Sequence, residues 1–449
     1  MKNYILLTAA FILMFSMAVI GCNGPVEEET PDNIPNVLEG VKTAGDWSAR
    51  RAEIRTMMQD NYYGQWRSGE DVTYSISTKS FTYESVVYEY TALTVKVSHN
   101  SKNVEFDAMV AIPETAPPAG GYPLIVVFGG LDGADTLMGS KGDPRQYSMD
   151  KGYANISVTT SNVASDNSAR NGAFYTLYPY STSIPGNQTG VLMAWAWGAS
   201  KVLDALEAGA AAELNINANN TIVTGTSRNG KAAAVAGAFD ERFKITVPVS
   251  SGAGGAAIYR YFSNGQTYDL SGYFSYNGGG SWTVDGSNPQ SLGNVQGDSG
   301  GGWFNAKFRT YTLSDLPFDQ HFLLSLCAGV DRHLFMVNGF EWDKWTNPPG
   351  FFYAFELTKP VFELLGVPKN IAVSMHRFRH GMEQEDMVKL IKYANNVFYN
   401  IQDLTFDYVE TSKPKPATWN AFMEDLQKTP FSASVSASNN KTYRSGKPK

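Results

Sequence analysis

Residues 222 to 231 read Ile222-Val223-Thr224-Gly225-Thr226-Ser227-Arg228-Asn229-Gly230-Lys231, and an alanine-rich run follows over residues 232 to 238. This pattern indicates a strand that turns into a helix at Ser227. Small flanking residues suit a strained turn that lifts the hydroxyl out of the sheet and leaves the next amide free as an oxyanion donor. The spacing Gly-x-Ser-x-x-Gly is one residue longer than the common elbow Gly-x-Ser-x-Gly. An ordinary strand-to-helix turn therefore stays open as an alternative.

Apolar strands alternate with helical patterns on both sides of this turn. The expected strands are Leu124–Phe128, Asn155–Val158, Thr221–Thr224, Ile245–Val249, Leu334–Val337 and Ile371–Ser374. The expected helices are Val191–Glu207, Ala232–Phe239, Phe351–Leu365 and Glu385–Tyr399. Such alternation predicts an α/β protein of the α/β-hydrolase fold, with a mostly parallel central sheet between two layers of helices.

A nucleophilic serine needs a base, and the chain has 5 histidines. In this fold the chain order is serine, acid, histidine, so His99 is excluded because it precedes Ser227. His376 and His380 follow the last expected strand, where the fold presents its base. His321 and His333 flank an apolar segment and are expected to be structural.

The acid is expected between the serine and the final histidines. Residues 338 to 345 follow the strand Leu334–Val337 and contain Glu341 and Asp343. A carboxylate at this strand end can reach the imidazole and hold its tautomer. Asp343 is the first choice and Glu341 the reserve, with two solvated loop acids as the alternative.

Composition narrows the function classes. The chain has 449 residues, 43% hydrophobic content and a formal charge of −7, so nucleic acid is not an expected partner. The histidines lack the clustered spacing of a zinc site, and neither a metal nor an organic cofactor is expected. Of the 2 cysteines, Cys327 lies in an apolar run and is expected to be a buried, inert thiol.

The N-terminus has the pattern of a bacterial lipoprotein signal. A basic start, an apolar run and small residues precede Cys22, so residues 1–21 are expected to be removed and Cys22 to carry lipid. The protein would then be exported and held on a bacterial cell membrane by lipid alone, at a periplasmic or cell-surface face. An uncleaved membrane helix is the alternative, although the run is short for a full span.

The remaining chain divides simply. Residues 22–40 are acidic and contain proline, which predicts a solvated tether. Residues 41–431 form one catalytic domain, whose first helix opens at Trp47 with Asp46 as its N-cap, and residues 432–449 form a disordered tail. We expect a monomer.

Several segments together resemble the glucuronoyl esterases, carbohydrate esterase family 15. The resemblance runs from Trp47 to the His380 loop. Its most specific segments are 193–207, 227–231, 236–242, 251–257 and the pair Trp303-Phe304.

The resemblance implies site roles. Ser227 matches the family's nucleophile, Arg228 an arginine that stabilises the oxyanion, and His380 the base. The sugar-binding matches are Lys231, which contacts glucuronate hydroxyls, Trp345, which lines the sugar pocket, Gln266, which touches the sugar, and Trp303 of the Trp-Phe pair.

The sequence departs from the family pattern in three respects. Many members carry the acid as Glu where this chain has Ser250, so the triad is expected to use Asp343. Fungal members join two cysteines where Thr226 and Gly381 stand here. A sugar-binding Glu before the Trp-Phe pair is replaced within the glycine run 300–302.

The expected function is hydrolysis of the ester between 4-O-methyl-glucuronate side groups of xylan and lignin alcohols through an acyl-enzyme on Ser227. One rival is an acetyl or feruloyl esterase with the same triad. The other is a surface lipoprotein that binds glucuronoxylan without catalysis, an idea motivated by Ser250.

Overall fold

The structure is a computed structural model of the chain. It describes residues 34–83, 86–129, 144–184, 186–260, 267–269, 281–283, 292–297, 302–339, 343–376 and 380–401. Cys22, the expected signal segment, most of the expected tether and the expected C-terminal tail lie outside these ranges. Within them, no helix is both long and apolar enough to cross a membrane.

One large sheet organises the described residues. Its nine strands run in the spatial order β1-β2-β3-β5-β4-β6-β7-β10-β11. The bounds are β1 Asp71–Tyr83, β2 Val86–His99, β3 Lys102–Ala111, β4 Tyr122–Phe128, β5 Ala154–Val158, β6 Ile216–Thr226, β7 Ile245–Val249, β10 His333–Gly339 and β11 Ile371–His376. β1, β2, β3 and β5 pair antiparallel, and the pairs from β5 through β4, β6, β7 and β10 to β11 are parallel.

All six strands expected from apolar runs lie in the parallel part of this sheet. Their bounds agree within two residues, except that β6 begins five residues before the expected start at Thr221. The four expected helices are also present, as α7 Val191–Ala205, α9 Arg228–Phe239, α12 Pro348–Leu364 and α13 Gln384–Tyr399. The α/β-hydrolase fold predicted from the sequence is thereby confirmed.

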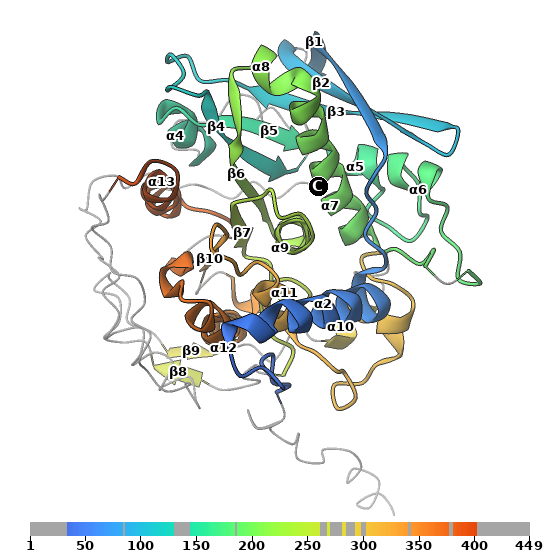
Figure 1. The fold of residues 1–449 in the computed structure, drawn as a ribbon, viewed down its shortest axis with the longest axis vertical. Coiled ribbons are helices and arrows are strands. Elements are labelled where there is room, and N and C mark those ends of the chain that lie inside the picture. The colour runs from blue at the N-terminus through green and yellow to red at the C-terminus, as the bar shows by residue number, and fades with distance from the viewer. Residues whose placement is uncertain are drawn as a thin grey trace, which may run out of the picture.

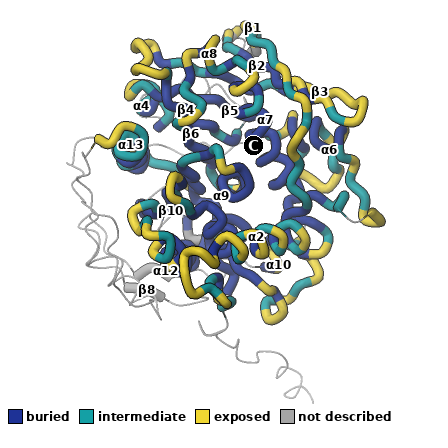
Figure 2. Tube along the Cα trace, in the orientation of Figure 1, coloured by how far each residue is buried: buried dark blue, intermediate teal, exposed yellow. Residues whose placement is uncertain are grey.

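Helices cover both faces of the sheet (Figure 1). α7 and α9 pack on one face in a large apolar core, and α13 packs on the other in a smaller one with Ile125, Ile222 and Val247. Figure 2 shows α9 dark blue after its first two residues and the outer side of α13 lighter. The amino-acid composition explains this difference in burial. α9 is rich in alanine and packs between the sheet and α7, whereas α13 is amphipathic.

The remaining elements are short apart from α2, and most of them connect the layers. They are η2 Ala44–Asp46, α2 Trp47–Met58, η3 Gln59–Tyr63, α4 Pro144–Asp150, α5 Thr160–Val163, α6 Ala173–Leu177, η4 Leu206–Ala210, α8 Ala211–Glu213, β8 Thr267–Asp269, β9 Ser281–Thr283, α10 Leu292–Gln296, η6 Lys307–Thr310, α11 Gln320–Ser325, η7 Lys344–Thr346 and η8 Pro368–Asn370. β8 and β9 pair with each other in a separate ribbon.

The start of the domain differs from the sequence expectation. Asp46 does not cap α2, because its carboxylate turns back and accepts hydrogen bonds from the Thr43 and Lys42 amides at 2.8 and 3.1 Å. Residues 34–40, expected in the tether, lie against the domain. Val37 is 4% exposed, and its carbonyl accepts a hydrogen bond from Arg50 Nε at 3.0 Å.

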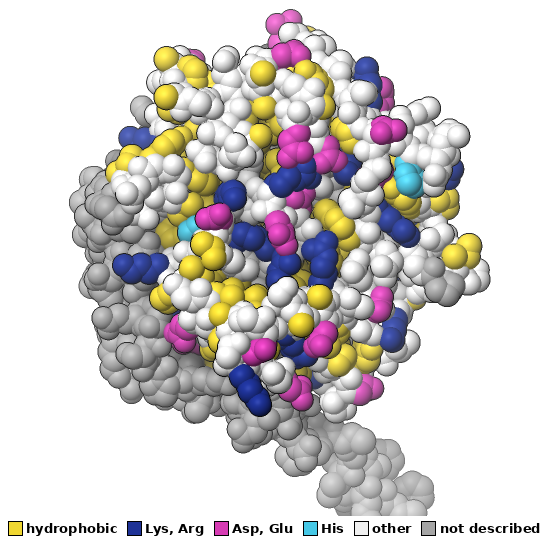
Figure 3. Space-filling view, viewed as in Figure 1, with side chains coloured by type: hydrophobic (Ala, Val, Ile, Leu, Met, Phe, Trp, Pro, Cys, Tyr) yellow, Lys and Arg dark blue, Asp and Glu magenta, His cyan; other side chains and the backbone are white. Residues whose placement is uncertain are grey.

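Charges on the face drawn in Figure 3 are mixed in sign, with Lys and Arg beside Asp and Glu in its middle. Several of the charged residues that the structure describes form ion pairs. Arg242 contacts Asp204 at 2.7 Å and Asp240 at 2.6 Å, and these pairs join the end of α7 to the end of α9. Such pairing gives the two helices a polar clamp far from the serine turn.

Candidate active site

The serine turn joins β6 to α9. Ser227 has φ 64° and ψ −129°, a left-handed conformation that costs a residue with a side chain roughly 1–3 kcal/mol. Its amide donates to the Val249 carbonyl of β7 at 2.9 Å, which holds the turn in place. Strain stored at a side chain that projects from a strand end is typical of a nucleophile elbow.

The two glycines of the motif are required by close packing. A Cβ on Gly225 would lie 2.6 Å from the Asn229 carbonyl oxygen, and one on Gly230 would lie 2.6 Å from that of Val249. α9 therefore leaves the strand at a distance that only glycine permits. Asn229 and Gly230, the second and third residues of α9, both pack against the backbone of Gly225. The second glycine of the motif is therefore at position 230 and not at 229.

His380 forms a short hydrogen bond with Asp343. The Nδ1–Oδ1 distance is 2.6 Å, and a carboxylate cannot donate, so Nδ1 carries the proton and Nε2 is left as an acceptor. Asp343 is fully buried just beyond β10, while the His380 side chain is 33% exposed. Glu341, the reserve acid, lies outside the described residues. The Trp345 ring packs on His380 with centroids 4.7 Å apart.

The His380 loop is fastened to the serine turn. Gly381 donates its amide hydrogen to Ser250 Oγ at 3.2 Å, and a Cβ on Gly381 would meet Thr226 Cγ2 at 3.5 Å. Thr226 and Gly381 are the chain neighbours of Ser227 and His380, so the histidine loop runs close to the serine turn. Ser250, at the position where the resemblance leads one to expect an acid, instead accepts a hydrogen bond from the backbone of the histidine loop.

Asp166 supports two of the sequence-predicted residues at once. One carboxylate oxygen contacts Arg228 Nε at 2.9 Å, and the other accepts a hydrogen bond from Trp303 Nε1 at 2.7 Å. The Arg228 side chain is 56% exposed, so little packing holds it in place. The ion pair with Asp166 fixes the guanidinium beside the serine turn. Sequence reasoning missed Asp166 because it lies in a loop that has no motif of its own.

Lys231 lies one helical turn after Ser227 and is 1% exposed. Its ammonium donates to the carbonyls of Ser251 and Ala253 and lies 5.5 Å from the centre of the Trp303 ring. Burial lowers its pKa to about 7. Trp303 is itself 6% exposed, so it forms the wall behind Lys231 and has little face left for a sugar.

The other predicted residues are accounted for separately. Gln266, Gly300 and Gly301 lie outside the described ranges. His376 ends β11 and contacts Asp386 of α13 at 2.7 Å, away from the serine turn. His321 and His333 contact the Pro35 carbonyl and the Tyr393 hydroxyl, each at 2.9 Å.

Cys327 is buried, which raises the pKa of its thiol. Within the described ranges, no group of three His, Cys, Asp or Glu residues is placed to hold a metal ion.

The arrangement suits acyl transfer. Four groups lie at the carboxyl ends of β6, β10 and β11. They are the strained Ser227, His380 with an acceptor nitrogen, the buried carboxylate of Asp343 and the guanidinium of Arg228. A cation beside a developing oxyanion stabilises the transition state more than the ground state.

Comparison with known proteins gives consistent matches. A family model described as "Glucuronyl esterase, fungi" matches residues 95–366, more than half of the chain. The chain is 38% identical over 382 residues to a multidomain esterase of Ruminococcus flavefaciens, covering 83% of this chain and 46% of that protein. It is 31% identical over 332 residues to the 4-O-methyl-glucuronoyl methylesterase of Cerrena unicolor, covering 73% of this chain and 60% of the other.

A solved structure is also similar. The carbohydrate esterase family 15 glucuronoyl esterase from Caldicellulosiruptor kristjansonii has a TM-score of 0.73 and 37% identity, over 86% of this chain and 95% of that one. The chain spans about half of the first relative's length and 60% of the second's. The match to the solved domain is therefore the more complete one.

Proposed function

The chain belongs to the glucuronyl esterase family, and from this membership we propose that it is a serine carboxylic-ester hydrolase that cleaves glucuronate esters. Its relative in Cerrena unicolor is a 4-O-methyl-glucuronoyl methylesterase, which supports 4-O-methyl-glucuronate as the acyl part. The ester between a xylan glucuronate side group and a lignin alcohol is the substrate proposed here.

The proposed mechanism uses residues of this chain alone. Ser227 Oγ attacks the uronate carbonyl carbon while His380 Nε2 accepts its proton, and Asp343 holds the imidazolium. Arg228 and its amide stabilise the oxyanion, with an amide near Gly129 as a further donor. His380 then gives the proton to the leaving alkoxide oxygen, the C–O bond breaks, and the alcohol departs. Water enters by the same base catalysis and releases the uronic acid.

The observation that carries this proposal is the 2.6 Å hydrogen bond between His380 Nδ1 and the fully buried Asp343. It fixes the tautomer that a general base requires, and the hydrogen bond from the Gly381 amide to Ser250 Oγ holds the histidine loop at the end of β7. A protein that only bound the polysaccharide would gain nothing from a strained serine next to an oriented base.

The test is release of benzyl alcohol from benzyl glucuronate by the purified protein, run beside 4-nitrophenyl acetate and with Ser227→Ala as control. We expect cleavage of the glucuronate ester that disappears in Ser227→Ala. Cleavage of the acetate alone would indicate a general polysaccharide esterase, and no cleavage of either ester would indicate a binding protein.

We also propose that the protein is exported and lipid-anchored through Cys22. The proposal rests on the basic, apolar and small-residue pattern of residues 1–21. Partition of the protein into detergent should be lost in Cys22→Ser. Equal partition of the two proteins would contradict the anchor.

A further inference from the structure

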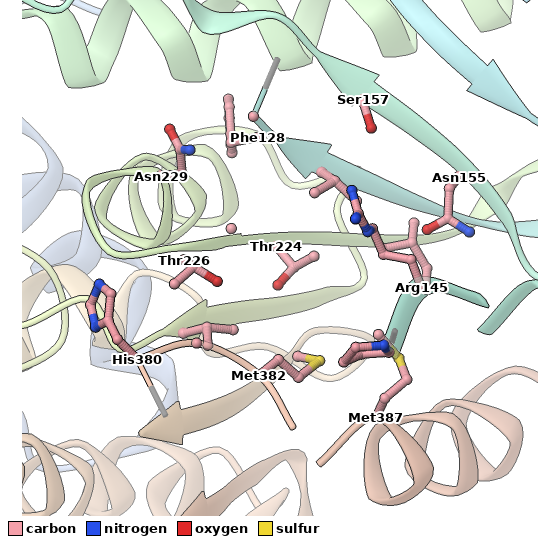
Figure 4. A pocket seen from close by; sticks show the side chains of 17 residues that line it. Phe128, Arg145, Asn155, Ser157, Thr224, Thr226, Asn229, His380, Met382 and Met387 are labelled. Atoms are coloured by element: carbon pink, nitrogen blue, oxygen red, sulfur yellow. The ribbon is translucent and has the colours of Figure 1, made fainter. Parts of the chain in front are cut away.

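His380 has few contacts that hold its ring in place. A cavity of about 270 Å³ opens beside the imidazole, and the side chain is 33% exposed. Figure 4 shows His380 at one end of this cavity, with Met382 and Met387 farther along it. Packing therefore does not fix the imidazole on the cavity side, and the position of Nε2 against Ser227 depends on how the chain around His380 is held.

The chain around His380 runs from β11, the last strand in the sheet order, to α13. β11 ends at His376 and α13 begins at Gln384, so the histidine loop consists of residues 377–383. Side chains of a strand alternate between the two faces of a sheet. Val373 and Met375 belong to the larger core, which leaves Ser374 and His376 facing α13.

One carboxylate joins the two ends of this loop. Asp386, in the first turn of α13, is 1% exposed. Its Oδ1 atom accepts a hydrogen bond from Ser374 Oγ at 2.7 Å, and its Oδ2 atom lies 2.7 Å from His376 Nδ1. Oδ2 also accepts a hydrogen bond from the amide of Glu383, the residue before α13, at 2.9 Å. Asp386 therefore ties the end of β11 to the end of the histidine loop.

Asp386 is charged at neutral pH despite its burial. Burial alone raises the pKa of a carboxyl group, but the contacts with His376, Ser374 and the Glu383 amide outweigh it, so the pKa of Asp386 lies below its ordinary value. The contacts with the two strand residues therefore involve a charged group. Contacts of this kind are shorter and stronger than those between neutral groups.

Capping of α13 explains only part of this arrangement. In a capping box, the side chain at the third helical position accepts a hydrogen bond from the N-cap amide, and the contact with Glu383 fulfils that role. Asp46 occupies the same position in the capping box of η2, where it is exposed and contacts Thr43 and Lys42 of its own turn. The two contacts from Asp386 to β11 go beyond helix capping.

We propose that Asp386 is a positioning residue for the reaction proposed above and that it acts through His380; this inference rests on the proposed esterase function. Apolar packing of α13 against the sheet is non-directional, so it does not fix the helix along β11. The contacts of Asp386 fix it, and they hold both ends of the histidine loop while Asp343 holds the ring. A displacement of about 1 Å in a catalytic group can reduce the rate by about 100-fold.

The experiment measures kcat and KM on benzyl glucuronate for the wild type and for single-residue variants, each at a temperature where circular dichroism shows it fully folded. Ser374→Ala removes one contact of the Asp386 carboxylate, and we expect kcat to fall by about fivefold or more. Asp386→Asn loses the charge opposite His376, and we expect kcat to fall by about 30-fold or more. KM should stay within about twofold in both variants, because the residues proposed to bind glucuronate do not lie on the histidine loop.

Ser325→Ala is the matched control. Ser325 is buried like Ser374, and its Oγ donates one short hydrogen bond, to the His321 carbonyl at 2.6 Å within α11. The control therefore loses the same atom from the protein interior, but in a helix that packs in the larger core and not beside the histidine loop. Its kcat and KM should equal the wild-type values.

The inference is overturned if the folded Ser374→Ala and Asp386→Asn proteins keep the wild-type kcat, if the loss appears in KM alone, or if Ser325→Ala loses as much kcat as Ser374→Ala. Wild-type cleavage of the ester in those cases would keep the proposed function, whereas a wild type that is inert toward benzyl glucuronate would overturn both. If Asp386→Asn does not fold, the comparison of Ser374→Ala with Ser325→Ala decides.

Discussion

At the scale of the residue, Asp343 is the candidate for the triad acid that the geometry supports best. Asp343 is fully buried, and its carboxylate meets His380 at 2.6 Å. Asp343→Asn keeps the shape but favours the wrong imidazole tautomer, so we expect kcat on benzyl glucuronate to fall by about 10⁴. Glu341→Gln is the matched control and should stay near wild type. The reverse pattern would move the acid to Glu341.

Asp166 is expected to act through Arg228. In Asp166→Ala the exposed guanidinium loses its 2.9 Å anchor, and we expect kcat to fall by at least roughly tenfold while KM changes less, because the oxyanion forms only along the reaction. Asp166→Asn still accepts the Trp303 hydrogen bond but lacks the charge. An activity of Asp166→Asn equal to wild type would mean that Asp166 only supports Trp303.

A matched control for Asp166 exists in the clamp between α7 and α9. Glu207 contacts Arg242 at 3.0 Å with similar partial exposure. Glu207→Ala should leave both kcat and KM unchanged, because surface ion pairs contribute at most about 1 kcal/mol and this one is remote from the serine turn.

Lys231 gives the site a pH dependence of its own. Burial lowers its pKa to about 7, so the ammonium is present below that pH and lost above it. If the charged form binds glucuronate hydroxyls, KM should rise as the pH increases from 6 to 8.5. Lys231→Met should have a higher KM that is flat over this range. A wild-type KM that does not change with pH would remove the role of the charge.

The sequence could propose Ser227, His380 and Asp343 as candidates because each is tied to a motif or to a strand end, and the contact between the last two is the part that the structure shows. Asp166 could not be found in this way, since its role depends on a contact between a loop after α5 and the serine turn. The sequence also could not predict that Trp303 is almost completely buried. The residue type alone does not distinguish a tryptophan that lines a pocket from one that packs behind it.

At the scale of the element, the sequence was most informative where strands are buried on both faces. β4, β7 and β10 are continuous apolar runs, and each was located to within two residues of its bounds. β1 was missed: it reads Asp71-Val72-Thr73-Tyr74-Ser75-Ile76-Ser77-Thr78-Lys79-Ser80-Phe81-Thr82-Tyr83, and edge strands with polar faces lack that signal. Its partner is β2, paired along the full length of β1.

The junction of β6 with the loop after β11 permits a designed crosslink. Thr226 Cγ2 lies 3.5 Å from the Cβ position of Gly381, close enough for a disulfide after Thr226→Cys and Gly381→Cys. Closing so long a loop stabilises by up to about 4 kcal/mol, less the cost of a side chain at φ 132°. We expect the oxidised double variant to unfold at higher denaturant than its reduced form. No change on reduction would show that the strain cancels the gain.

At the scale of the whole molecule, two apolar cores share one sheet, and the serine turn lies where they meet. The larger core takes side chains from α2, α7, α9, α11 and α12, and the smaller one from α13. This division places Lys231 and Trp303 on the side of the larger core, whereas Ile125 and Val249 lie on the side of the smaller one. It also means that the larger core depends on segments near the start of the chain.

The folded domain begins before residue 41, and truncation tests this boundary. Val37 is buried, Ile34 and Leu38 pack on the larger core, and the Pro35 carbonyl contacts His321 at 2.9 Å. Burying a valine contributes about 1.5–3 kcal/mol and each hydrogen bond about 1. A protein beginning at residue 41 should therefore melt several degrees below one beginning at residue 34, whereas one beginning at residue 24 should match the latter. Equal melting of all three would place residues 34–40 in the tether after all.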